Sequence, residues 1–234
     1  MSLSLQPIYL FADSQLLFWR QDGFLFLDLV RARIDVKAPR AAYVGASNGD
    51  KPEFYAIFKE AMESILVHDC RMISSSYTAA DAAFMSEANI ILLAGGDVRK
   101  GWEVFEQSGM KADIIRQYTE GALMIGVSAG AVQLGMLARS DDIVFETLKL
   151  VPFIIGAHEE KTGWEELQRM IERSTWNIQG TGIPTGGGAV YHQDNSLEAI
   201  RHPLTAFSLR DGKIVQSILM PRSTYEDLTS SQVN

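Results

Sequence analysis

The sequence has little of several features that would each define a class of protein. Its one cysteine, Cys70, excludes an internal disulfide, fits a reducing compartment and is interpreted as a structural residue near a strand start. No apolar run is long enough to span a bilayer. The first residues also lack the basic and apolar regions of a signal peptide, so we expect a cytoplasmic protein.

Basic clusters and cofactor motifs are missing as well. The 234 residues carry a formal net charge of −8 without a long basic cluster, so nucleic acids and anionic membranes are not expected partners. There is no phosphate-binding loop, and Gly-Gly-Asp at residues 95–97 lacks the third glycine of a dinucleotide fingerprint. No clustered Cys/His pattern indicates zinc. We therefore expect no cofactor and no metal.

Apolar strand-like runs alternate with segments of helical period through the first two thirds of the chain. Strands are predicted over residues 7–11, 41–45, 71–74, 90–93 and 123–127, and helices over residues 23–33, 52–67, 78–87, 101–107, 111–120 and 129–137. This alternation predicts an α/β fold with a mostly parallel sheet and helices on both faces. Ligands of such sheets bind beyond the carboxyl ends of the strands.

The last third of the chain has a different pattern. Short strands are predicted over residues 154–156, 177–182, 189–191, 197–200 and 213–219, with one helix over residues 164–174. No linker, repeat or low-complexity segment interrupts the chain. We expect one domain over residues 1–234 that ends in short hairpin strands. Such a chain could form a homodimer.

The most informative segment is an apolar run at residues 123–127 that ends in Gly-x-Ser-x-Gly around Ser128. This pattern is typical of a nucleophile elbow, a sharp strand-to-helix turn. Gly126 and Gly130 leave room for that turn, and the amide of Ala129 at the helix N-terminus could stabilise an oxyanion. The alternative is a buried serine in an ordinary strand–helix turn.

A serine nucleophile needs a base, and the chain offers His68, His158, His192 and His202. His68 ends the helix predicted over residues 52–67 and is expected at the surface. His158 follows the run Phe-Ile-Ile-Gly-Ala at residues 153–157, so it shares the strand-end position expected of the active edge. We therefore rank His158 first, with His192 and His202 behind it.

Three blocks carry a family resemblance: Ile-Leu-Leu-Ala-Gly-Gly-Asp at 91–97, Gly-Val-Ser-Ala-Gly-Ala at 126–131, and Leu-Val-Pro-Phe-Ile-Ile-Gly-Ala-His at 150–158. In type, order and spacing they resemble blocks of the peptidase E and cyanophycinase group of serine peptidases, peptidase family S51. The resemblance extends over about residues 41–190. It implies a flavodoxin-like sheet and a small peptide substrate.

The resemblance also implies roles for individual residues. Ser128 would be the nucleophile, His158 the general base, and the amides of Gly96 and Ala129 the oxyanion hole. Two positions are candidates for the third acid. The peptidase E branch points to Asp142, with Asp141 adjacent to it.

In the cyanophycinase branch the third acid is a glutamate, and Thr185 or Gly186 stands in its place here. Loss of a triad carboxylate can lower turnover by about ten-thousandfold.

Candidates for substrate binding are fewer. Peptidase E holds an aspartate side chain with basic groups, and the planar fork of arginine suits that task. Asp97, Arg99 and Arg169 are the substrate-binding candidates here, with Lys100 and Trp102 as further specificity residues. The segment after His158 is acidic, so Asp specificity does not carry over directly.

The leading hypothesis is a serine peptidase that cleaves small peptides or isopeptide-like amides. One alternative is an α/β-hydrolase esterase, whose base would be His202. Another is a non-catalytic protein that binds a small ligand, which the loss of the glutamate at Thr185 motivates. A glutamine amidotransferase would need a cysteine where Ser128 stands.

Overall fold

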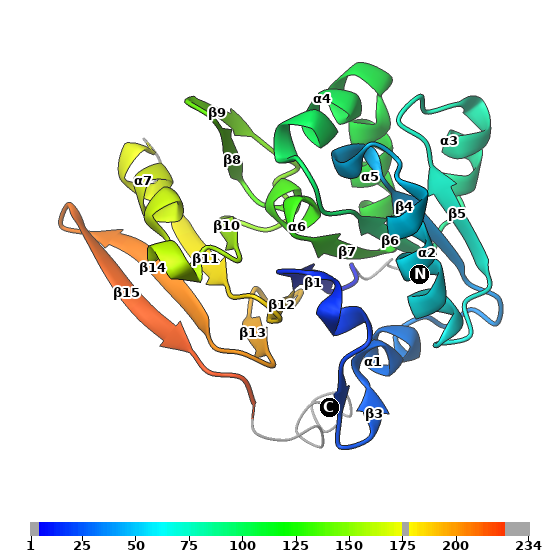
Figure 1. The fold of residues 1–234 in the computed structure, drawn as a ribbon, viewed down its shortest axis with the longest axis horizontal. Coiled ribbons are helices and arrows are strands. Elements are labelled where there is room, and N and C mark those ends of the chain that lie inside the picture. The colour runs from blue at the N-terminus through cyan, green and yellow to red at the C-terminus, as the bar shows by residue number, and fades with distance from the viewer. Residues whose placement is uncertain (1–4, 175–177, 223–234) are drawn as a thin grey trace.

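A computed structural model describes residues 5–174 and 178–222, and two sheets with their helices build the fold (Figure 1). The main sheet has seven strands, in the spatial order β13 (Leu197–Ile200), β12 (Gly188–Tyr191), β1 (Ile8–Phe11), β7 (Leu123–Val127), β6 (Ile90–Leu93), β4 (Arg40–Val44) and β5 (Asp69–Ile73). The strands from β1 to β5 in this order are parallel, and β12 and β13 extend the sheet antiparallel. The predicted mostly parallel sheet is confirmed.

Helices cover both faces of the main sheet, as predicted (Figure 1). They are α1 (Phe26–Ala32), α2 (Pro52–Glu63), α3 (Ala79–Met85), α4 (Val98–Ser108), α5 (Met110–Thr119) and α6 (Ala129–Leu134). Phe58 and Met62 of α2 are buried on one face with α1, and Trp102 and Phe105 of α4 are buried on the other with α3, α5 and α6. Because successive side chains of a strand point to opposite faces of the sheet, the side chains of each strand are divided between these two cores.

The connections from β4 and β6 diverge at the carboxyl edge of the main sheet. The chain leaves β4 through the 3-10 turn η2 (Ala46–Asn48) toward α2 on one face, whereas it leaves β6 toward α4 on the other. Neighbouring parallel strands whose connections part in this way open a crevice between their loops. The fold thus provides a binding position before any particular side chain is considered.

A second sheet lies beside the first and has four strands, in the order β10 (Phe153–Ala157), β11 (Gln179–Ile183), β14 (Leu204–Arg210) and β15 (Lys213–Leu219). Helix α7 (Glu165–Arg173) packs on it through Leu167 and Ile171. Gly180 and Gly182 allow this packing, since a Cβ at Gly182 would lie 2.6 Å from the ring of Trp164. Residue 177, where the strand predicted over 177–182 begins, lies outside the described residues.

Some elements were missed or misplaced by the sequence analysis. Strand β14 and the hairpin of β8 (Leu137–Ser140) and β9 (Ile143–Glu146) were not predicted. The helix predicted to residue 137 ends at Leu134, because Gly135 turns to extended backbone. The helix predicted to residue 67 ends at Glu63, and the chain turns through Leu66 at a φ of 62°.

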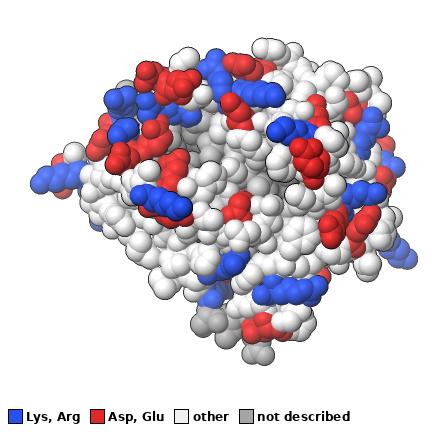
Figure 2. All heavy atoms as spheres, viewed as in Figure 1, with Lys and Arg blue, Asp and Glu red and all other residues white. Residues whose placement is uncertain are grey.

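Short elements complete the fold: the 3-10 turns η1 (Ser14–Leu17) and η3 (Glu160–Thr162), and the small hairpin of β2 (Arg20–Gln21) and β3 (Phe24–Leu25). None of the helices in the described ranges combines the length and apolar character needed to span a bilayer. Figure 2 shows cationic and anionic side chains interspersed on one face, so no basic surface dominates that view.

Gly130 offers a test of how tightly α6 packs on the sheet. A Cβ at Gly130 would lie 2.0 Å from the carbonyl oxygen of Leu93, whereas a Cβ at Gly109, which has a φ of 81°, would contact nothing within 4 Å. Gly130→Ala should therefore lower the free energy of unfolding by about 3 kcal/mol through overpacking. Gly109→Ala should cost about 1 kcal/mol through backbone strain alone. Urea unfolding followed by circular dichroism measures both, and equal losses would contradict the packing argument.

Candidate active site

Ser128 lies at a sharp turn between β7 and α6, at the carboxyl edge of the main sheet. Its backbone has a φ of 50° and a ψ of −111°, which is strained for a residue with a side chain. The Ser128 amide donates a 2.8 Å hydrogen bond to the carbonyl of Phe11 in the neighbouring strand, which helps to hold the turn. Although Ser128 occupies the N-cap position of α6, its side chain does not cap the helix. The hydroxyl is therefore left available for another partner.

The glycines around Ser128 are required by close backbone contacts. A Cβ at Gly126 would lie 2.6 Å from Cα of Ala131, and Leu93 crowds Gly130 more closely still. A Cβ at Gly95 would lie 3.3 Å from Cβ of Ser128, so the loop after β6 lies directly against the serine. The prediction that this turn requires small residues for steric reasons therefore agrees with the geometry.

His158 brings its ring to Ser128 from the second sheet. It follows β10, where its amide donates a 2.9 Å hydrogen bond to the carbonyl of Ile183 at the end of β11. Its backbone has a φ of 50°, and Nε2 lies 2.8 Å from Oγ of Ser128. The structure thus joins the two side chains that the sequence ranked first.

The other histidines lie elsewhere. His192 Nε2 is 3.0 Å from Oε2 of Glu198, and His202 packs beside Gly187. His68 is exposed, as expected. The α/β-hydrolase alternative required His202 as the base. The histidine that contacts Ser128 is His158 instead.

Two backbone amides beside Ser128 have no hydrogen-bond partner in the described part of the chain: those of Gly96 and Ala129. Gly96 has a φ of 141°, and a Cβ there would lie 2.2 Å from the carbonyl oxygen of Ser47. Asn48 supports the same loop, because its side-chain amide donates a 3.2 Å hydrogen bond to the carbonyl of Gly95. Unpaired amides next to a serine hydroxyl can accept a developing oxyanion.

The structure does not bring Asp142 to His158. Asp141 and Asp142 form the turn of the β8–β9 hairpin, with Asp141 at a φ of 54°. The Asp142 side chain is 100% exposed, and its carboxylate accepts a 3.0 Å hydrogen bond from Arg139. The hairpin carries this acid away from the histidine, which corrects the sequence assignment.

A carboxylate that sequence analysis did not select, that of Glu160, lies near His158 instead. Glu160 begins the 3-10 turn two residues after His158, and its carboxylate meets the hydroxyl and amide of Thr185. Burial alone would raise the pKa of Glu160. Hydrogen bonds from Thr185 and from its own backbone, together with the attraction of His158, instead hold that pKa below its usual value. Its Oε2 is buried, with no hydrogen-bond partner in the described ranges.

Comparison with known proteins shows the family of the chain. The model of peptidase family S51 matches residues 21–200. The chain belongs to peptidase family S51. Comparison with curated proteins found no match.

Two solved structures share the S51 fold with this chain. One is a peptidase from an acI-B1 Actinobacterium, with a TM-score of 0.70 and 12% identity over 94% of this chain and 96% of that one. The other is a putative peptidase E protein from Listeria monocytogenes EGD-e, with a TM-score of 0.55 and 16% identity over 92% of this chain and 100% of that one. At these identities the likeness concerns the fold.

The substrate-binding candidates of this S51 chain lie in different places. Asp97 lies beside the site, where its carboxylate caps α4 by accepting a 2.9 Å hydrogen bond from the amide of Lys100. Arg99 pairs with Glu103 and lies over the ring of Phe145. Arg169 is exposed on α7 and pairs with Glu165. Asp97 therefore lies in the lining of the cavity beside Ser128. Arg99 and Arg169 instead form ion pairs with Glu103 and Glu165.

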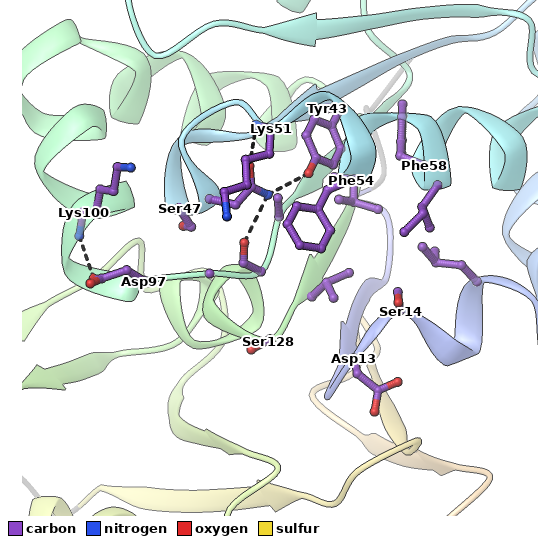
Figure 3. A pocket seen from close by; sticks show the side chains of 18 residues that line it. Asp13, Ser14, Tyr43, Ser47, Lys51, Phe54, Phe58, Asp97, Lys100 and Ser128 are labelled. Carbon is purple, nitrogen blue, oxygen red and sulfur yellow. Dashed lines mark hydrogen bonds between the residues drawn. The ribbon is translucent and has the colours of Figure 1, made fainter.

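A cavity of about 520 Å³ opens next to Ser128, at the crevice between the loops after β4 and β6. Figure 3 shows Tyr43, Phe54 and Phe58 toward one end of it and Asp97 and Lys100 toward the other. Lys100, a further candidate from the sequence, thus reaches the cavity. Trp102 is buried in the core instead.

Two other predictions concern groups away from the cavity. Cys70 is half-buried and its thiol donates to the carbonyl of Val67; burial, with smaller effects of Glu63 and Asp69, raises its pKa to about 11. A thiol with such a pKa is a poor nucleophile, which favours the structural interpretation. Among the described residues no group of three or more His, Cys, Asp or Glu side chains is arranged to hold a metal ion.

Glu159, next to His158, gives the structure a specific pH dependence. Burial, and then the nearby Glu166 carboxylate, raise the pKa of Glu159 from 4.5 to about 7. Between these two pH values the folded chain holds a proton that the unfolded chain has released. The free energy of unfolding therefore falls as the pH rises through this window.

Glu159→Gln should remove that loss. Between pH 5 and pH 8 the wild-type chain should lose on the order of 1 to 3 kcal/mol more stability than the variant does. Urea unfolding at both pH values measures the difference. Glu172→Gln, at an exposed position of α7, is the control and should follow the wild type. Parallel pH profiles for Glu159→Gln and the wild type would contradict the assignment.

Proposed function

We propose that this S51 chain is a serine peptidase that cleaves small peptides or isopeptide-like amides, with Ser128 as the nucleophile and His158 as the general base. The observation that carries the proposal is the 2.8 Å contact between Ser128 Oγ and His158 Nε2 beside two unpaired amides. Nucleophile, base and oxyanion donors are the minimum set for acyl transfer, and here they meet at one sheet edge.

Acylation follows from this arrangement. With its proton on Nδ1, His158 accepts the Ser128 hydroxyl proton at Nε2 while Oγ bonds to the substrate carbonyl carbon. The carbonyl oxygen gains negative charge and is stabilised by the amides of Gly96 and Ala129. Collapse of the tetrahedral intermediate breaks the C–N bond, and His158 transfers its proton to the leaving amine.

Deacylation reverses these roles. Water takes the place of the amine, His158 removes one of its protons, and the resulting hydroxide attacks the acyl carbon. The bond to Oγ breaks, the acid is released, and the proton on Nε2 returns to Ser128. His158 is thus unchanged after one turnover.

Glu160 is proposed as the positioning residue for His158. Its carboxylate lies beside Thr185, which with Gly186 is one of the two positions matching the acid of the cyanophycinase branch, and it interacts favourably with the charge on His158. A carboxylate near the ring stabilises the imidazolium that forms during acylation. The absence of an acid at Thr185, which motivated the non-catalytic alternative, is therefore offset by an acid on the neighbouring loop.

Chemical labelling tests the nucleophile. A fluorophosphonate probe should label the wild type, whereas Ser128→Ala should not react, because the probe needs an activated hydroxyl. His158→Ala should lower kcat for a dipeptide substrate by at least about ten-thousandfold. Ser86→Ala, an exposed serine at the end of α3, should behave as the wild type. Equal labelling of the wild type and Ser128→Ala would reject Ser128 as the nucleophile.

Three matched amide substitutions test Glu160. Glu160→Gln should lower kcat by about a hundredfold or more, while Glu159→Gln and Asp142→Asn stay near the wild type. The KM of the dipeptide should stay within about twofold, because the imidazolium that Glu160 stabilises forms only during acylation. A merely structural role of Glu160 would raise KM together with the loss in kcat. A larger loss of kcat with Asp142→Asn than with Glu160→Gln would favour Asp142, the acid predicted from the sequence.

A further inference from the structure

The cavity beside Ser128 is built mainly from apolar side chains. Aromatic rings of Tyr43, Phe54 and Phe58 form one end (Figure 3). The aliphatic side chains of Leu17 and Ile57 also line the cavity. Phe54 is 44% exposed, so part of its ring is free to cover a ligand. A cavity of about 520 Å³ with such a lining suits a bulky apolar group.

The polar groups of the cavity do not change this character. The Asp13 carboxylate accepts hydrogen bonds from the amides of Gln15 and Gly186, and Asp97 is used to cap α4. Burial raises the pKa of Tyr43 to about 12, although the hydrogen bond from Asn48 opposes the rise, so its phenol stays neutral. Lys51 lies near the ring of Phe54 at the open side.

The direction of the cavity relative to His158 decides which part of a substrate it receives. All its lining residues lie between Asp13 and Ser128 in the sequence, in the main sheet and its connections. His158 approaches Ser128 from the second sheet and contributes nothing to the lining. The leaving group must face His158 because it receives the proton from Nε2. The other substituent of the carbonyl carbon, the acyl group, then points toward the cavity.

We propose that this cavity is the acyl pocket, the part of the site that binds the acyl group of the substrate. It selects substrates with a bulky apolar acyl side chain, aliphatic or aromatic, and this inference rests on the proposed function. An aspartyl side chain would lose its hydration among Phe54, Phe58 and Ile57. The two lysines of the lining, Lys51 and Lys100, are exposed, so an ion pair with either would recover little of that cost. The preference therefore departs from the acidic specificity that the resemblance to peptidase E suggested.

A series of p-nitrophenyl esters that differ only in the acyl chain tests the pocket. From acetate to hexanoate, kcat/KM should rise by on the order of a hundredfold, at about fourfold per buried methylene. Dipeptides should follow the same order, with Phe-Xaa and Leu-Xaa cleaved faster than Asp-Xaa. A flat ester series, or Asp-Xaa as the best dipeptide, would overturn the inference.

Phe54→Ala supplies the matching variant, because Phe54 is partly exposed and stands outside the proposed catalytic groups. Its kcat/KM for the hexanoate ester should be at least tenfold below that of the wild type. Its kcat/KM for the acetate ester, whose acyl chain is too short to reach Phe54, should stay within about twofold of the wild-type value. Phe24→Ala, an exposed phenylalanine outside the cavity lining, should leave both rates unchanged. Equal losses on both esters with Phe54→Ala would also overturn the inference.

Ligand binding separates failure of the pocket from failure of the proposed function. Hexanoate and acetate are titrated calorimetrically into Ser128→Ala, which needs no turnover. Tighter binding of hexanoate, lost on adding Phe54→Ala, would support the pocket even if no substrate were hydrolysed. Hydrolysis of acetate ester with no preference for hexanoate in rate or binding would retain the serine mechanism and reject the pocket.

Discussion

The contact between Ser128 Oγ and His158 Nε2 depends on the way two sheets are docked. The serine belongs to the main sheet and the histidine to the second, and the distance of 2.8 Å exists only while both keep their relative position. The amide of Met136 donates to the carbonyl of Phe153, and a Cβ at Gly135 would lie 3.0 Å from the same carbonyl oxygen. Close backbone contacts and buried side chains such as Phe153 and Ile155, which pack in one core with the main sheet, therefore set the distance between Ser128 and His158.

Part of the backbone strain in the chain lies where the proposed chemistry takes place. Ser128, His158 and Gly96 all have positive φ values, and each stands at the end of a strand in one of the two sheets. Strained residues cost about 1 to 3 kcal/mol each and persist only where the surroundings fix them. Here buried parallel strands supply that support, and the strained turns direct a hydroxyl, a ring and an amide toward one point.

Much of this arrangement could be predicted from local sequence. The strand Leu123–Val127 and the turn at Ser128 follow from an apolar run that ends in small residues, and both signals lie within ten positions. The position of His158 also followed from a short run and its block resemblance. The helix predicted over residues 52–67 shows the limit of periodicity, since buried Ile65 and Val67 continue the apolar pattern of α2 after the helix has ended. The helix predicted over residues 23–33 likewise included strand β3, and α1 begins only at Phe26.

The third acid and the second sheet could not be found in the same way. Asp142 and Glu160 are both acidic residues near turns, and only the pairing of β10 with β11 distinguishes them, because it brings Glu160 next to Thr185. That pairing joins segments more than twenty residues apart. Strand β14 was missed for a related reason, since its alternation is weak and its identity comes from its neighbours on either side.

The exposed β8–β9 hairpin has a consequence for how the chain can be divided. It separates Ser128 from His158 in the sequence, and its base is closed by backbone hydrogen bonds from Leu148 to Gln133 and from Lys149 to Gly135. A break between Asp141 and Asp142 would thus leave the serine on one polypeptide and the histidine on the other. The proposed hydrolysis would then report the reassembly of two fragments, each inert when alone.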